Sequence, residues 1–179
     1  MNDWNVVVTV YDGGYHPARR FLRRFGPVEQ TEYFNILLMR VPHPRQLLEL
    51  LLEEGERDPH GFAALARVMP IDAAFSFMSA AEFEETAKEV VAPWVPRLCG
   101  KRFHVRMHRR GFKGRMSSLD EERFLDTWLL EATEAAGDPA RMAFEDPDLI
   151  IAVETMGPRA GVSIWSDEEL KRFKLLHLD

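Results

Sequence analysis

The sequence has almost no cysteine and no long apolar run. Cys99 is the single cysteine among 179 residues, so no disulfide can form within the chain. A lone cysteine is typical of a reducing compartment, where it more often fills a core than acts as a nucleophile. No apolar stretch approaches the ~20 residues of a membrane span, and residues 1–11 lack the basic start and cleavage site of a signal peptide. We therefore expect a cytoplasmic protein without a membrane partner.

The usual catalytic and cofactor-binding patterns are also missing. "DGGYHP" follows a strand-like run but contains neither G-x-G-x-x-G nor G-x-x-x-x-G-K-[ST], so a plain turn is favoured. On a strand, His104 and His108 would lie ~13 Å apart, too far to share a zinc ion. Asp120 and Glu121 are explained by the start of a helix. We expect no catalytic residue, no cofactor and no metal site.

Negative charge is absent from one stretch of an otherwise acidic chain. The formal net charge is -6 and the isoelectric point is near 5.6. Between Arg97 and Arg115 there is no Asp or Glu, but there are eight Lys or Arg residues. A local cationic patch on an acidic body can bind a polyanion at one face while the rest of the surface disfavours indiscriminate binding.

The first 71 residues alternate between strand and helix patterns. Strands are predicted in "WNVVVTVY", at residues 28–31, in "YFNILLMRV" and in "ARVMPI". Helices are predicted in "HPARRFLRRFG" and in "HPRQLLELLLEEG", the second ending at Gly55. The order strand, helix, strand, strand, helix, strand is that of a ferredoxin-like fold, with two helices on one face of an antiparallel sheet.

The pattern changes between Ile71 and Ser79. Ser79 with Glu82 three residues later forms a capping box, which predicts a helix that Pro93 and Pro96 end. From residue 102 to residue 108, polar and apolar residues alternate, which predicts a half-buried strand with its polar side chains on one face.

The remaining residues predict a helix, two strands and a last helix. The helix opens at Ser117-Ser118 and stops at Gly137. The strands "DPDLIIAVET" and "AGVSIWS" join across Gly157-Pro158, and the first is apolar enough for a central position. "DEELKRFKLL" predicts the terminal helix. The expected fold class is α+β, with a ferredoxin-like domain at residues 1–73 and a second αβ domain at residues 74–179.

The cationic stretch is the candidate binding site. Guanidinium groups make bidentate contacts with phosphate, and imidazoles on the same face add stacking and hydrogen-bond donors. A solvated charged face is the simpler alternative. "GFKG" fits the G-x-x-G loop of a KH domain, but that loop joins two helices and this one follows a strand. The predicted RNA contacts are Arg102, His104, Arg106 and His108 on the strand and Arg109, Arg110, Lys113 and Arg115 in the loop.

A second group of cations lies in the first predicted helix. Arg19, Arg20, Arg23 and Arg24 fall within one short segment. If the two halves of the chain pack suitably, these side chains could extend the same binding surface.

Residues 74–176 resemble a THUMP domain, the RNA-binding module of tRNA 4-thiouridine synthases and of several RNA methyltransferases. The resemblance lies in "KRFHVRMHRRG", in "SSLDEERFLDTWLLEAT", in "FEDPDLIIAVET" and in "AGVSIWS". In the third of these, Asp146 stands where the family usually has Asn. The first half is similar to the ferredoxin-like domain that commonly precedes THUMP.

The resemblance implies recognition of tRNA, typically at its acceptor end, with the chemistry done elsewhere. No methyltransferase or pyrophosphatase domain follows, so the chain looks most like the stand-alone members, such as the adaptor of the tRNA cytidine acetyltransferase. We expect a non-enzymatic, tRNA-binding adaptor for an acetyltransferase or methyltransferase.

The competing hypothesis is a protein-interaction or small-ligand regulatory module of ferredoxin-like type. If RNA is bound, reversing the charge at Arg106 and Arg110 should abolish retention of tRNA and leave the melting temperature nearly unchanged.

Overall fold

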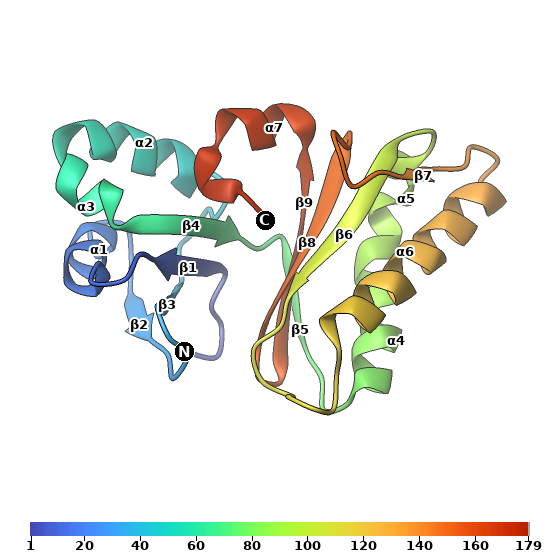
Figure 1. Ribbon diagram of the computed structural model, residues 1–179, viewed down its shortest axis with the longest axis horizontal. Helices are drawn as coiled ribbons and strands as arrows, with labels where there is room; N and C mark the ends of the chain where they lie inside the picture. Colours follow the sequence, from blue (N-terminus) through green and yellow to red (C-terminus); the bar gives the residue numbers. More distant parts are fainter. Residues whose placement is uncertain (179) are drawn as a thin grey trace. The chain divides into compact units, whose positions relative to one another are not determined.

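The computed structural model describes residues 1–178 and divides them into two compact units (Figure 1). Residues Met1–Asp72 and Arg172–His177 form the N-terminal unit, and Ala73–Lys171 with Leu178 form the C-terminal unit. The sequence placed the division one residue later and assigned all of residues 172–179 to the second domain. Each unit contains one sheet with helices, which confirms the α+β fold class.

The N-terminal unit has the predicted ferredoxin-like strand order. Its sheet runs β2-β3-β1-β4, and all neighbouring strands are antiparallel. The elements are β1 (Val6–Val10), α1 (Tyr15–Leu22), β2 (Val28–Gln30), β3 (Ile36–Met39), α2 (Leu47–Arg57), α3 (Pro59–Ala63) and β4 (Leu65–Pro70).

The sequence missed α3 because it ended the preceding helix at Gly55. The structure continues α2 through Gly55, where the ring of Phe62 packs so closely that a Cβ would lie 2.7 Å from its Cδ2 atom. Asp58 then caps α3, since its carboxylate accepts a 3.0 Å hydrogen bond from the Gly61 N–H. Glycine in this helix is therefore a packing requirement and not a stop signal.

The C-terminal unit is built on a mixed sheet of order β5-β9-β8-β6-β7. Strand β6 runs parallel to β7 and β8, whereas β9 is antiparallel to β5 and β8. All eight residues of β8 are buried, as the central position requires. The strands are β5 (Ala73–Ser76), β6 (Arg102–His108), β7 (Arg141–Met142), β8 (Leu149–Met156) and β9 (Arg159–Ser166).

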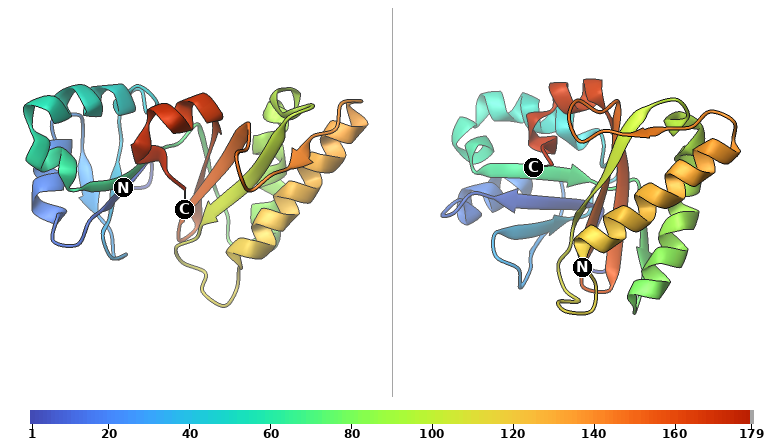
Figure 2. Two further views of the ribbon diagram at one scale, coloured as in Figure 1. Left: turned by 45° about the horizontal axis from the view of Figure 1, so that its top comes forward. Right: turned by 45° about the vertical axis from the view of Figure 1, so that its right-hand side comes forward.

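Helices α4 (Ala80–Val91) and α6 (Ser118–Ala135) cover one face of this sheet (Figure 2). Both start as the sequence predicted, because Ser79 and Ser117 accept hydrogen bonds from the N–H groups of Glu82 and Asp120. Pro93 and Pro96 do not end the helical path. Pro93 lies at the start of the 3₁₀ helix η1 (Ala92–Trp94), and Pro96 lies at the start of α5 (Val95–Leu98). At the start of a helix the N–H that proline lacks has no partner within the helix, so no hydrogen bond is lost.

The predicted terminal helix is interrupted at Phe173, which has an extended backbone. It divides into α7 (Asp167–Arg172) and the 3₁₀ turn η2 (Lys174–Leu176). Within the N-terminal unit, Arg172 pairs with Glu49, and Nε2 of His177 lies 2.8 Å from the carbonyl oxygen of Ala66. These contacts explain why the segment belongs to that unit.

No helix within residues 1–178 combines the length and the apolar character that crossing a membrane requires.

Candidate nucleic-acid interface

Strand β6 carries half of the predicted contacts. Phe103, Val105 and Met107 point into the core beneath the helices, so the alternating polar side chains lie on the other face, as predicted. That polar face is less open than the sequence indicated. His104 is only 5% exposed, and Arg102, Arg106 and His108 are partly buried.

Carboxylates of α6 hold the backbone of β6. Strand β7 pairs only with Arg102 and Phe103, so the backbone N–H groups further along β6 need other acceptors. Asp126 accepts from the N–H of Val105 at 3.1 Å, and Glu122 accepts from that of Met107 at 3.0 Å. Burial raises the pKa of Asp126 to about 7, although the Val105 hydrogen bond opposes the rise. Asp126 and Glu122 therefore accept hydrogen bonds from the backbone of β6 and are not part of its polar face.

Arg102 is paired with Asp148. The backbone N–H of Arg102 donates to Oδ2 at 2.8 Å and its Nη2 donates to Oδ1 at 3.2 Å. The backbone hydrogen bond, followed by the side-chain hydrogen bond, holds the pKa of Asp148 below its usual value. The Arg102 side chain is still 41% exposed, so a second anion can reach it.

His104 supports an exposed aromatic ring. Its Nδ1 lies 2.9 Å from the carbonyl oxygen of Ala143, and because a carbonyl only accepts, Nδ1 carries the proton. The ring of Phe144, which is 73% exposed, lies over the imidazole with centroids 5.5 Å apart. Phe144 was not singled out in the sequence. Its only signal there was an aromatic residue in a polar loop.

Arg110 and His108 share a fully buried carboxylate, Glu154. Nη1 of Arg110 lies 2.5 Å from Glu154 Oε2, and Nδ1 of His108 lies 3.8 Å from Oε1. The backbone N–H of Arg110 also donates to Thr155 Oγ1 at 2.9 Å. Glu154 faces His108 in the β6–β8 register. The sequence signal for this pair was an acidic residue inside an apolar strand.

These contacts change what we expect of Arg110. The sequence treated it as a surface cation whose reversal leaves the melting temperature unchanged. A side chain paired with a buried carboxylate is a structural element, and its reversal would place two negative charges together in a buried site.

The loop after β6 is held by Phe112. Its ring packs 5.0 Å from that of Phe77, and its backbone has a positive φ of 55°. The guanidinium of Arg115 lies over the Phe112 ring, 4.4 Å from its centroid. Lys113 and Arg115 are exposed, and Arg109 is partly buried, with Nη1 donating to the Gly111 carbonyl. The contact between Phe112 and Phe77 therefore anchors the loop that carries these cations.

The eight predicted residues thus fall into two groups. Arg110, His108 and His104 have internal partners and little exposure, and Arg106 donates from Nε to the Leu178 carbonyl at 3.2 Å. The second group is Arg102, at the start of β6, and Arg109, Lys113 and Arg115 in the loop after the other end of the strand. We call these three loop residues the exit-loop cluster; Lys113 and Arg115 are its exposed members.

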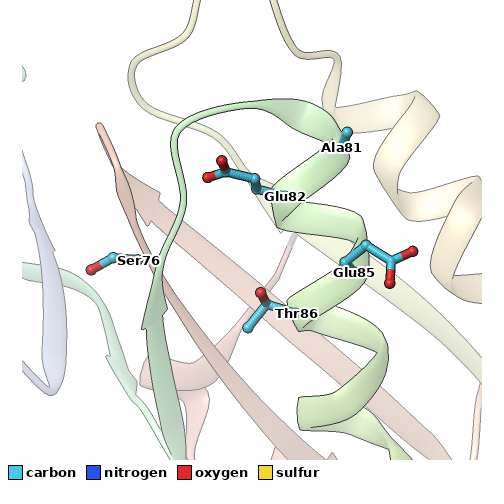
Figure 3. A pocket seen from close by; sticks show the side chains of 5 residues that line it. All are labelled: Ser76, Ala81, Glu82, Glu85 and Thr86. Atoms are coloured by element: carbon cyan, nitrogen blue, oxygen red, sulfur yellow. The ribbon is translucent and has the colours of Figure 1, made fainter.

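A pocket of about 370 Å³ lies elsewhere on the C-terminal unit, between β5 and α4 (Figure 3). Glu82 and Glu85 line it, but both already have partners. Glu82 accepts from the Met78 N–H at 2.8 Å, and Glu85 pairs with Lys88 at 2.9 Å. Among residues 1–178, no group of three or more His, Cys, Asp or Glu side chains is placed to hold a metal ion. Both acids of this pocket therefore have partners within the C-terminal unit.

Glu121 predicts a dependence of stability on pH. The side chain is 3% exposed, and burial, followed by a hydrogen bond with Glu84, raises its pKa from 4.5 to about 8. Between these values the folded protein keeps a proton that the unfolded chain has lost, so stability falls as pH rises through this window. We expect Glu121→Gln to raise the free energy of unfolding at pH 9 by about 2 kcal/mol and to change it little at pH 4.

Urea unfolding at the two pH values measures this effect. Glu131→Gln, at an exposed position on the same helix, is the control and should leave the pH dependence unchanged. An equal loss of stability between pH 4 and pH 9 in wild type and Glu121→Gln would contradict the assignment.

Comparison with known proteins finds similarity in the fold alone. No protein-family model and no curated protein sequence matches the chain. Solved structures do match. PH1313 from Pyrococcus horikoshii is 12% identical with a TM-score of 0.61, and the match covers 90% of this chain and 54% of that protein. TrmN from Thermus thermophilus is 16% identical with a TM-score of 0.57, covering 89% and 44% respectively.

A 4-thiouridine synthetase, solved as an RNA complex with bound ATP, is 11% identical with a TM-score of 0.56. The match covers 92% of this chain and 42% of the synthetase. The chain therefore spans about half of the length of these proteins. What it shares with them is a THUMP-like α+β fold, as the sequence predicted.

Proposed function

We propose that this protein binds structured RNA, specifically the acceptor end of tRNA, and presents it to a separate modifying enzyme. The observation that carries the proposal is the exit-loop cluster, in which Lys113 and Arg115 are exposed on a loop that Phe112 anchors. Arginine and lysine that are fixed in position can contact backbone phosphates without a large loss of side-chain entropy on binding. Such contacts orient RNA and do not read its sequence.

The exposed ring of Phe144 supports binding of an unpaired nucleotide. Single-stranded bases stack on exposed aromatic side chains, and the free 3′ end of tRNA offers such bases. Because His104 lies against Phe144, the ring is supported in place before RNA arrives. A duplex alone would not use this ring.

The adaptor role is supported by the positions of the acidic groups. The two carboxyls with strongly raised pKa values, Glu121 and Asp126, are buried on α6. Asp126 is occupied by the backbone of β6, and the acids of the β5–α4 pocket are occupied by a helix cap and a lysine. We therefore propose that the chemistry on the RNA is done by a partner, of the acetyltransferase or methyltransferase class.

A binding experiment with defined RNAs tests the proposal. We expect a labelled tRNA to bind with an affinity that falls by about 100-fold between 50 and 200 mM salt, the value for about four phosphate contacts. We expect an acceptor-stem minihelix with an unpaired 3′ end to compete as well as full tRNA, and the same minihelix without its unpaired 3′ nucleotides to compete at least about 10-fold less well, since stacking of those bases is lost. Fluorescence anisotropy measures both.

Two outcomes would oppose the proposal. Freshly purified protein that carries no small RNA and binds none at 50 mM salt would exclude RNA binding. Salt-insensitive self-association under the same conditions would instead favour the protein-interaction hypothesis.

A further inference from the structure

Helix α1 in the N-terminal unit has one face made entirely of basic side chains. His16, Arg19, Arg20 and Arg23 follow at spacings of three, one and three residues, which places them on one side of the helix. Ala18, Phe21 and Leu22 occupy the opposite side and are buried. We call the four basic residues the α1 stripe.

A cavity of about 400 Å³ opens along the α1 stripe, and the same four side chains line it. No carboxylate is among its lining residues. A phosphate group fits this space, and guanidinium groups are the side chains best matched to phosphate oxygens.

The arginines of the α1 stripe differ from the neighbouring Arg24 in their ion pairing. Arg24 pairs with Glu54 at 2.8 Å and with Asp58 at 2.9 Å. Within residues 1–178, Arg19, Arg20 and Arg23 form no ion pair, and the buried Nε of Arg19 has no hydrogen-bond partner. An unsatisfied buried donor is costly, and an anion oxygen in the adjoining cavity would satisfy it once the guanidinium turned towards it.

The helix dipole does not account for the stripe. Cations in the last turn of a helix are favourable, which explains Arg19 and Arg20. It does not explain a basic His16 in the first turn, where acidic residues are favoured and where α1 has none. The three arginines concentrate positive potential on this face.

We infer that the α1 stripe is a second phosphate-binding site, which engages backbone phosphates of the same RNA. The inference rests on the proposed function for its ligand. It adds the N-terminal unit to the binding surface and predicts that RNA affinity depends on arginines outside the exit-loop cluster.

The salt dependence of RNA binding tests this site. Replacing Arg19 and Arg23 with Gln removes two phosphate contacts, so we expect the slope of log affinity against log salt to fall in magnitude by about two and the affinity at 50 mM salt to fall about 10-fold. Arg40→Gln with Arg57→Gln is the control. It removes the same charge from the same unit, but at exposed arginines that lie 3.9 Å and 3.0 Å from carboxylates. The control should keep the wild-type slope.

A second probe does not need RNA. Titration of inorganic pyrophosphate should shift the arginine Nε–H NMR signals that disappear in the Arg19→Gln and Arg23→Gln variant. If the Arg19→Gln and Arg23→Gln variant binds RNA with the same slope of log affinity against log salt as wild type, the α1 site is refuted and the proposed function stands. If wild type binds no RNA, both fail, and shifts with pyrophosphate would then identify the stripe as a site for small anions only.

Discussion

Replacing Lys113 and Arg115 with Glu is expected to weaken tRNA binding by about 100-fold at 100 mM salt. Each reversal removes one phosphate contact and adds a repulsion to the polyanion, and these contacts supply most of the affinity of such interfaces. Both side chains are exposed, and among residues 1–178 neither pairs with a carboxylate. The melting temperature should therefore change by no more than ~2 °C, because exposed substitutions away from packed sites have small effects on stability.

The matched control is the double reversal of Lys88 and Arg123. These exposed or partly exposed cations lie on α4 and α6, the helices that cover the opposite face of the sheet, and their replacement changes the net charge equally. We expect this variant to bind tRNA within about 3-fold of wild type at the same salt. Equal losses in the two variants would mean that net charge, and not the exit-loop cluster, controls binding.

Replacing Arg110 alone with Leu is expected to lower the free energy of unfolding by about 3–5 kcal/mol. The substitution takes from the fully buried Glu154 carboxyl the guanidinium that lies 2.5 Å away in the wild type. His108, at 3.8 Å, is too distant to replace the lost hydrogen bond. Chemical denaturation at pH 7 measures the loss.

Replacing Arg110 and Glu154 together with Leu should recover most of that stability. Apolar residues of similar volume commonly substitute for a buried ion pair without net cost. If the pair is structural, the double variant should also bind tRNA within about 3-fold of wild type, since neither side chain would contact phosphate. A folded double variant that has lost tRNA binding would restore Arg110 to the interface, as the sequence first indicated.

Local patterns were sufficient to predict most helices and strands. The alternation at residues 102–108 predicted β6, and the serine caps at Ser79 and Ser117 predicted the starts of α4 and α6. Both signals lie within seven consecutive residues or fewer, so they do not require knowledge of the tertiary fold. The short strands β5 and β7 were missed because their pairing with β9 and β6 forms them, and their own residues give little signal.

The charge pattern placed the candidate interface between residues 97 and 115, and that placement stays a prediction. It could not show that Asp148 and Glu154, 46 and 44 residues away, lie beside Arg102 and Arg110. Counting charges along the sequence treats every cation as equally available. The structure shows that a cation's ion pairing depends on which carboxylates the neighbouring strand places beside it.

The sequence by itself determined the two α+β halves and the concentration of positive charge between residues 97 and 115, because periodicity and composition are local properties. Only the tertiary structure decided which cations remain accessible. The parallel pairing of β6 with β8 brings distant carboxylates against Arg102 and Arg110, whereas Lys113, Arg115 and the arginines of the α1 stripe have no carboxylate partner within residues 1–178. Ion pairing requires proximity in space, and that proximity is set by the sheet and not by the order of residues.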